Sequence, residues 1–215
     1  MTYKAIIFDL DGTLVNSIAD IADAMNVVLA ERNYPIYDYK TYKTFVGSGV
    51  KSLVIKALPD MAHKQSEIDE CLLNMMQVYS KNCTNKTMPY DGILELLDTL
   101  NKKEIKLSVL SNKVDSLTKK VSKALLPEYL SPVLGLKEEA LKKPNPKVAL
   151  HICKELNVNP EETIFVGDTN ADIQTAINAN MKAIGVSWGF RHKKELLESG
   201  AEFILEKPLD LLKLL

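Results

Sequence analysis

Short apolar runs alternate with longer segments of helical periodicity along most of this 215-residue chain. The first run, Ala5 to Phe8, is unbroken, which favours a strand buried on both faces of a parallel sheet. Helical segments separate the later runs, as expected for strands joined by crossover connections. The pattern therefore predicts an α/β fold with a doubly wound, mainly parallel, Rossmann-like sheet. The later strands are expected at 105–110, 132–135, 163–166, 181–186 and 203–204.

One long segment interrupts this alternation, because it holds helical patterns and no convincing strand. Ser17 to Arg32 has apolar residues at helical spacing, and Asp20 falls in its first turn, where a negative charge favours the helix dipole. Further helices are expected around 38–45, 50–58 and 66–81. We expect residues 16–83 to form a helical cap, inserted into an α/β core made of residues 1–15 and 84–215. A cap inserted directly after the first strand would act as a lid.

Composition and charge exclude several classes of function. The net charge is −1, so no overall field attracts nucleic acid or anionic lipid. No window approaches the roughly 18 consecutive apolar residues of a membrane span, and the N-terminus does not resemble a signal peptide. Three cysteines without a CxxC pair argue against a disulfide framework or a zinc site. We expect a cytoplasmic protein, monomeric or homodimeric, without a nucleic-acid or membrane partner.

Polar residues gather where the predicted strands end. The carboxyl ends of parallel strands share one edge of the sheet, which is where ligands bind in such folds. Together these residues would supply a nucleophile, a hydroxyl donor, a cation and metal-binding carboxylates, which phosphoryl transfer requires. A polar turn and a helix cap are the structural alternatives for the first two groups. The residues are Asp9 and Asp11, Ser111 and Asn112, Lys143, and Asp168.

In this order, the same residues resemble the motifs of the haloacid dehalogenase superfamily. The resemblance spans essentially the whole chain, and the predicted insert resembles the small helical cap of that superfamily. Segments 11–17 and 45–49 are most similar to phosphoglycolate phosphatases. The chain departs from the usual pattern at Asn16, where Asp is common, and at Ser111, where Thr is frequent. The motifs are Asp9-Leu10-Asp11-Gly12-Thr13, Ser111-Asn112, Lys143-Pro144 and Gly167-Asp168-Thr169-Asn170-Ala171-Asp172.

The resemblance implies a catalytic role for four residues. Asp9 would attack phosphorus and become an aspartyl phosphate. Asp11 would protonate the leaving alkoxide and then take a proton from the hydrolytic water. Ser111 would donate to a phosphate oxygen, as would the main-chain N–H of Asn112. Lys143 would neutralise the phosphoryl charge.

The resemblance also implies Mg²⁺ as the cofactor. The metal would be held by the Asp9 carboxylate, the Asp11 main-chain carbonyl and Asp168. Asp172 lies one helical turn after Asp168 and would either hold a metal-bound water or orient Lys143.

Weaker candidates concern the substrate. Thr13 would either contact substrate or bond locally in its turn. Gly47, Ser48 and Gly49 would either offer backbone N–H groups to an anion or serve as punctuation between helices. Lys51 would either meet a substrate carboxylate or remain a surface lysine.

These assignments imply a Mg²⁺-dependent phosphatase that acts on a small phosphomonoester, with 2-phosphoglycolate as the favoured substrate. A hexose-phosphate mutase and a pyrophosphatase on the same scaffold are the alternatives. A non-catalytic binding protein is disfavoured, since a binding scaffold has no need of intact Asp9, Asp11, Lys143 and Asp168.

Overall fold

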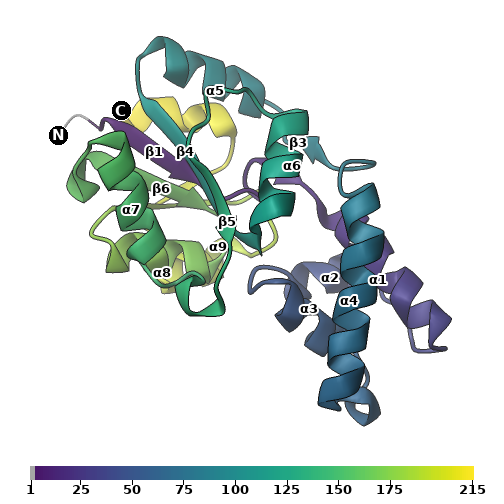
Figure 1. Cartoon of the computed structure of the whole chain (residues 1–215). Helices are drawn as coiled ribbons and strands as arrows, with labels where there is room; N and C mark the ends of the chain where they lie inside the picture. The colour runs from purple at the N-terminus through teal and green to yellow at the C-terminus, as the bar shows by residue number, and fades with distance from the viewer. Residues whose placement is uncertain (1–2) are drawn as a thin grey trace.

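A six-stranded parallel sheet with helices on both faces forms the centre of the larger part of the molecule (Figure 1). The computed structural model describes residues 3–215. All neighbouring strands of the sheet run parallel, in the order β5-β4-β1-β6-β7-β8. The predicted fold class is therefore confirmed. The strands are β1 (Ala5–Phe8), β4 (Lys106–Val114), β5 (Val133–Leu136), β6 (Thr163–Gly167), β7 (Lys182–Val186) and β8 (Phe203–Leu205).

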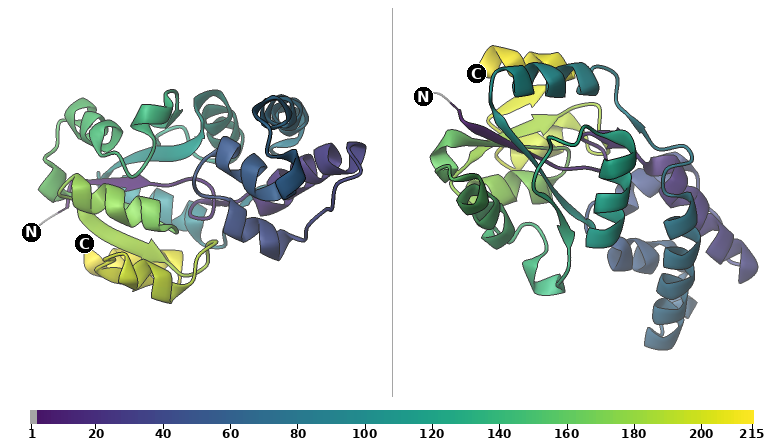
Figure 2. Two further views of the ribbon diagram at one scale, coloured as in Figure 1. Left: turned by 90° about the horizontal axis from the view of Figure 1, so that it is seen from below. Right: turned by 45° about the horizontal axis from the view of Figure 1, so that its top comes forward.

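Strand β1 is buried on both faces, as its unbroken apolar run predicts. Ile6 and Phe8 belong to one apolar cluster, which includes residues of α5 and α6, whereas Ile7 belongs to a second cluster with residues of α7, α8 and α9. Burying such a side chain contributes about 1.5–3 kcal/mol. Figure 2 shows the helices on the two sides of the sheet. They are α5 (Ile93–Lys102), α6 (Asp115–Leu125), α7 (Lys147–Leu156), α8 (Asn170–Asn178) and α9 (Lys193–Glu198).

The strand order places β1 where the direction of winding reverses. From β1 the chain first builds outward on one side through β4 and β5, and then on the other through β6, β7 and β8. The loops that leave neighbouring strands at such a reversal diverge, which opens a crevice beyond the carboxyl ends of the strands. Asp9 directly follows β1, so the fold places it in that crevice.

Strand β4 is longer than predicted. It continues through Ser111 and Asn112 to Val114, with a register shift against β5 between Leu110 and Val114. The polar residues were expected to end the strand, because Ser and Asn favour turns and caps. Ser111 and Asn112 are instead strand residues that reach past the sheet edge.

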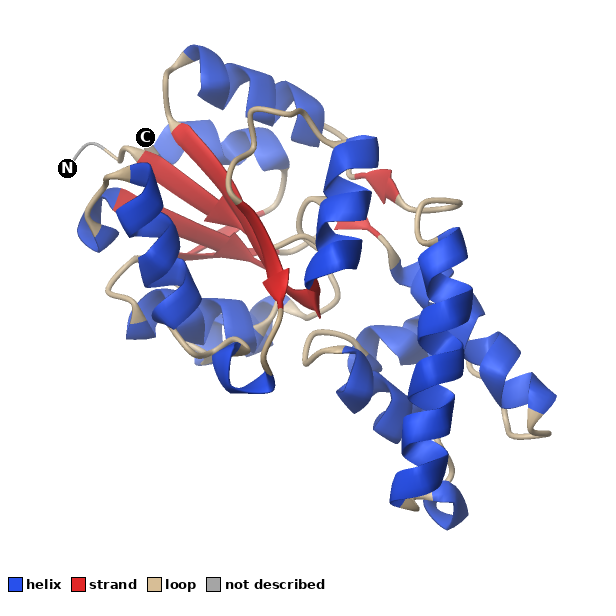
Figure 3. Cartoon of the chain, in the orientation of Figure 1, coloured by secondary structure: helices blue, strands red, loops and turns tan. Residues whose placement is uncertain are grey.

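A group of helices projects from the sheet edge at the lower right of Figure 3, beyond a short two-stranded connection. Strand β2 (Val15–Asn16) pairs antiparallel with β3 (Met88–Pro89), so the chain leaves and re-enters through adjacent strands. Helices occur in all the segments between 17 and 83 where they were predicted. The division into cap and core at residues 15/16 and 83/84 remains a prediction. The helices are α1 (Ile18–Glu31), α2 (Tyr39–Phe45), α3 (Val50–Ala57), η1 (Asp60–Ala62) and α4 (Gln65–Asn82).

Besides η1, the described residues contain three further 3₁₀ helices, η2 (Glu139–Leu141), η3 (Pro160–Glu162) and η4 (Pro208–Leu214). The last of these lies where the sequence pattern predicts a helix over 209–214. Within residues 3–215, the helices are too short or too polar to cross a bilayer.

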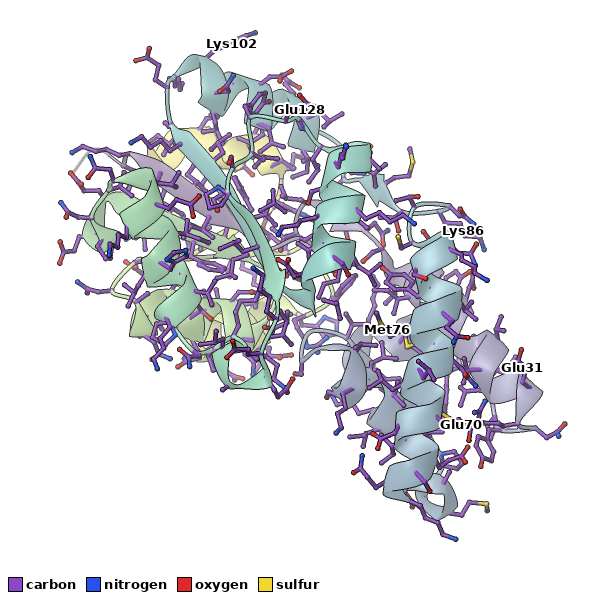
Figure 4. All side chains as sticks on the ribbon, in the orientation of Figure 1. Glu31, Glu70, Met76, Lys86, Lys102 and Glu128 are labelled. Carbon is purple, nitrogen blue, oxygen red and sulfur yellow. The ribbon has the colours of Figure 1, made fainter. Side chains whose placement is uncertain are left out.

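Asp20 links helix α1 to the segment by which the chain returns from the projecting helices to the core. Its buried carboxylate accepts hydrogen bonds from the backbone N–H groups of Lys86 and Thr87 and from the Thr87 hydroxyl, at 2.7–3.0 Å. Figure 4 shows Lys86 near the end of α4 that faces the sheet. Asp20 was predicted only to favour the dipole of its helix, and the structure gives it a second function. It fixes α1 to the segment that returns to the core.

We therefore expect Asp20→Ala to lower the free energy of unfolding by about 2–4 kcal/mol, because it leaves buried donors without an acceptor. Asp23→Ala is the matched control. Asp23 is 42% exposed and pairs with the Lys86 ammonium at the surface, so its loss should cost less than about 1 kcal/mol. Urea denaturation of the three proteins measures both values. Equal losses for the two variants would show that Asp20 does not hold the connection together.

Candidate active site

A buried lysine connects two aspartates at the sheet edge, one directly after β1 and the other in the first turn of α8. The Lys143 ammonium contacts Asp9 Oδ1 at 2.8 Å and Asp172 Oδ1 at 2.5 Å, and it also donates to the carbonyl of Leu110 at 3.0 Å. Burial lowers the pKa of Lys143, but Asp172 and then Asp9 outweigh it and hold the pKa above its ordinary value. The lysine is therefore a permanent cation beside Asp9.

Asp9 itself is held in a position that suits a nucleophile. Its side chain is only 8% exposed, and one of its oxygens is fixed by Lys143. Burial raises the pKa of Asp9 to about 7; Lys143 lowers it, and the nearby Asp172 adds to the rise. The second oxygen has no protein hydrogen-bond donor among the described residues, and Asp9 lines a pocket between the core and the projecting helices.

Asp168 is completely buried next to this pair. Its carboxylate accepts from the Thr13 hydroxyl at 3.2 Å and from the backbone N–H of Phe190 at 2.7 Å. Gly12, with φ of +93°, makes room for it, since a Cβ there would lie 2.3 Å from Asp168 Oδ2. Burial, followed by the charges of Asp9 and Asp172, raises the pKa of Asp168 well above its usual range.

Three of these carboxylates fit a divalent cation. Ligand atoms of Asp9, Asp168 and Asp172 lie within 4.8 Å of one another. Their combined negative charge exceeds the single positive charge of Lys143, and carboxylate oxygens are the ligands of hard cations such as Mg²⁺. Asp172 is less free than the others, because its second oxygen accepts from the backbone N–H and hydroxyl of Thr169 at 2.9 and 2.7 Å. This arrangement suits the predicted alternative in which Asp172 orients Lys143.

Asp11 faces a different cation. Its two oxygens lie 2.9 and 3.0 Å from the Lys113 ammonium, which also contacts the Tyr79 hydroxyl at 2.5 Å. Burial lowers the pKa of Lys113, but Asp11 and Tyr79 outweigh it, so the pKa is raised. Tyr79 comes from α4, so this contact joins the sheet edge to the projecting helices.

Ser111 and Asn112 also line the pocket, and Asn112 connects its walls. The Asn112 amide donates to the carbonyls of Gly47 and Lys143, at 3.1 and 3.3 Å, and accepts from the Lys143 backbone N–H at 2.8 Å. The side chain therefore positions Lys143, while the Ser111 hydroxyl lies in the pocket wall.

The weaker substrate candidates divide into three groups. Gly47 and Gly49 line the pocket. Ser48 and Lys51 are exposed and lie outside the residues that line it. Thr13 is fully buried, and its hydroxyl donates to Asp168, which is neither a substrate contact nor the local turn bond considered as its alternative. Their roles toward substrate remain predictions.

Two residues at the site were not expected from the sequence, and a third, Arg191, was only a weak candidate for a substrate contact. Lys113 directly follows the Ser111-Asn112 motif, but a lysine after a polar pair is usually a surface residue. Tyr79 was expected to serve only helix packing. Arg191 donates to the carbonyls of Lys43 and, at 2.6 Å, Val46, so it holds the end of α2 against the loop that follows β7. Its position after a strand at the active edge was the available signal.

Comparisons with known proteins agree with this arrangement. The model of the haloacid dehalogenase-like hydrolase family matches residues 6–186. A phosphoglycolate phosphatase of Mannheimia succiniciproducens is 33% identical, covering 99% of this chain and 98% of its own. One of Aquifex aeolicus is 34% identical, over 99% and 96%. A solved structure from Lactobacillus delbrueckii subsp. bulgaricus, provisionally described as a phosphoglycolate phosphatase, has a TM-score of 0.92 and 32% identity, over 98% of this chain and 97% of that one.

The chain belongs to the haloacid dehalogenase-like hydrolase family. It is accordingly a hydrolase.

We expect Mg²⁺ to stabilise this protein more at about pH 8 than at about pH 5. The folded-state pKa of Asp9, about 7, lies above the ordinary value of 3.8, so this carboxyl stabilises the metal-free fold below about pH 4 and loses that contribution as pH rises through 7. A metal ion binds the deprotonated Asp9 carboxylate, so its binding offsets this loss of stability. At a concentration about 100 times its Kd, the melting temperature should rise by about 5–10 °C.

Thermal melts with Mg²⁺ and with a chelator, at equal ionic strength and at both pH values, measure this effect. Asp168→Asn is the control and should lose most of the Mg²⁺-induced shift. A shift of the same size at both pH values would contradict the assignment of the cation to these carboxylates.

Proposed function

We propose that this hydrolase is a Mg²⁺-dependent phosphatase that cleaves a small phosphomonoester through an aspartyl phosphate on Asp9, with 2-phosphoglycolate as the preferred substrate. The observation that carries the proposal is the buried contact of Lys143 with both Asp9 and Asp172, next to Asp168. A binding scaffold would gain nothing from burying these charges together, because their desolvation is costly.

The residues act as follows. One oxygen of Asp9 attacks phosphorus, while Lys143 holds the other and offsets the charge that gathers on the phosphoryl group. Ser111 and the main-chain N–H of Asn112 donate to the phosphoryl oxygens. Asp11 protonates the departing alkoxide and, in the second step, takes a proton from the water that hydrolyses the aspartyl phosphate.

Asp9 and Asp168, with the main-chain carbonyl of Asp11, would hold Mg²⁺ when it is bound. The ion would supply positive charge to the phosphoryl oxygens and to the attacking carboxylate. Asp172, whose oxygens are both engaged by protein donors, would keep Lys143 in place.

The projecting helices serve as the lid of this site. They contribute Val46, Leu53 and Met75 to the apolar wall of the pocket, which limits the access of water to the reacting atoms. The preference for 2-phosphoglycolate is supported by the names of the relatives that match over nearly the full chain. The three buried, free cysteines support a reducing compartment such as the cytoplasm.

Phosphate release from 2-phosphoglycolate, a hexose phosphate, a nucleotide and pyrophosphate tests this proposal. We expect 2-phosphoglycolate to have the highest kcat/KM, and Asp9→Asn to lower kcat at least about 10⁴-fold because no nucleophile remains. Circular dichroism should show the variant folded, since Asn keeps the shape of the side chain.

Three outcomes oppose the proposal. Release by Asp9→Asn at the rate of the unsubstituted protein would remove Asp9 as the nucleophile. Interconversion of hexose phosphates without release of phosphate would identify a mutase. A higher kcat/KM for pyrophosphate than for every phosphomonoester would identify a pyrophosphatase.

A further inference from the structure

The pocket contains a second buried cation that the chemistry at phosphorus does not use. The side chain of Lys113 is only 5% exposed, and its ammonium contacts Asp11 and the Tyr79 hydroxyl. Asp11 is the residue expected to protonate the leaving oxygen, so its carboxyl must lie beside the leaving group. A cation within 3.0 Å of that carboxyl therefore lies on the leaving-group side of the site.

The other cation of the pocket is already committed. Of the described residues that line it, Lys113 and Lys143 carry positive charge. The three N–H groups of a lysine ammonium can serve three acceptors, and those of Lys143 contact Asp9, Asp172 and the Leu110 carbonyl. Lys113 also contacts three acceptor atoms, but Asp11, which supplies two of them, must turn to the leaving oxygen during the reaction. Lys113 is therefore the cation left for an anionic group at the far end of a substrate.

The remaining wall would not accept an unpaired anion. It is mostly apolar, and a carboxylate buried against such side chains without a counterion is strongly disfavoured. A substrate with a charged leaving group must therefore reach Lys113 or stay out of the closed pocket. The apolar lining residues are Ile21, Val46, Val50, Leu53, Met75, Met76, Val114 and Leu117.

We propose that Lys113, together with the Tyr79 hydroxyl, binds the carboxylate of the leaving group and thereby exchanges its partner, releasing Asp11. The proposal rests on the phosphatase function proposed above and names the device that selects its substrate. The exchange replaces one carboxylate by another at the same ammonium. The released Asp11 carboxylate takes up a proton from solvent, which it later gives to the leaving oxygen, so the buried charge stays balanced.

The exchange couples recognition to catalysis. With an anionic leaving group, Lys113 turns to the substrate and Asp11 is free to face the leaving oxygen. With a neutral leaving group, Lys113 stays on Asp11 and restrains it. A cationic leaving group is repelled by Lys113. Lys113 and Tyr79 are therefore specificity-determining residues, whereas a purely structural ion pair would treat the three kinds of ester alike.

Three small esters test this exchange: 2-phosphoglycolate, ethyl phosphate and 2-aminoethyl phosphate, whose leaving groups are anionic, neutral and cationic. We expect kcat/KM to fall in that order. Lys113→Met should lower kcat/KM for 2-phosphoglycolate by about 10–100-fold, as expected for the loss of a charge-assisted contact. The loss of kcat/KM for ethyl phosphate should be at least about 10-fold smaller, because this ester has no carboxylate for Lys113 to bind.

Further variants keep the test decisive if Lys113→Met folds poorly. Tyr79→Phe retains every charge and should raise KM for 2-phosphoglycolate by about 3–10-fold, with a smaller rise for ethyl phosphate. Lys113→Arg keeps the positive charge and should retain the preference for the anionic ester. Lys119→Met is the matched control, because this lysine is half exposed on α6 and pairs with Asp115 at the surface.

The outcomes separate this proposal from the underlying function. Equal losses for the anionic and neutral esters in Lys113→Met and Tyr79→Phe would overturn the exchange and make the contact structural. So would hydrolysis by the unsubstituted protein without preference for the anionic ester. Failure to release phosphate from any ester above the level of Asp9→Asn would instead overturn the phosphatase function itself.

Discussion

The site depends on the Lys143 ammonium, because without it Asp9 and Asp172 would be buried as unpaired negative charges. Breaking one partner of such a pair typically costs about 3–5 kcal/mol, since the other charge stays buried. The lysine therefore holds together segments more than 130 residues apart in the sequence. It also leaves an excess of negative charge beside Asp168, which is what a divalent cation requires.

The sheet makes this contact possible. Strand β1 lies between β4 and β6, so the residues that follow these three strands meet at one edge. Asp9 follows β1, Ser111 extends β4, and Asp168 follows β6. The projecting helices then close the other side through the contact of Tyr79 with Lys113 and of Arg191 with the end of α2. Chemistry at phosphorus and selection of the leaving group are thereby assigned to different walls of one pocket.

The sequence predicted the sheet and the gathering of motif residues, because the spacing of apolar residues and the polar residues at the ends of strands are both visible in short stretches of sequence. It did not predict Lys113 as a buried group, since a lysine ordinarily remains in solvent and only the fold brings Asp11 and Tyr79 to it. Thr13 shows the same limit: its bond to Asp168 spans 155 positions. Asp20 was expected only to favour the dipole of its own helix for the same reason, because the groups that donate to its carboxylate, on Lys86 and Thr87, lie far along the chain. Partners distant in sequence leave no local pattern.

The most direct test of the central claim is to find where the phosphoryl group goes during turnover. The protein is mixed with ³²P-labelled substrate and Mg²⁺, quenched in acid, and digested at low pH for mass spectrometry. Label on Asp9 at early times, lost as inorganic phosphate is released, is the predicted result. Single-turnover release with the label on another residue, or on none, would contradict the account.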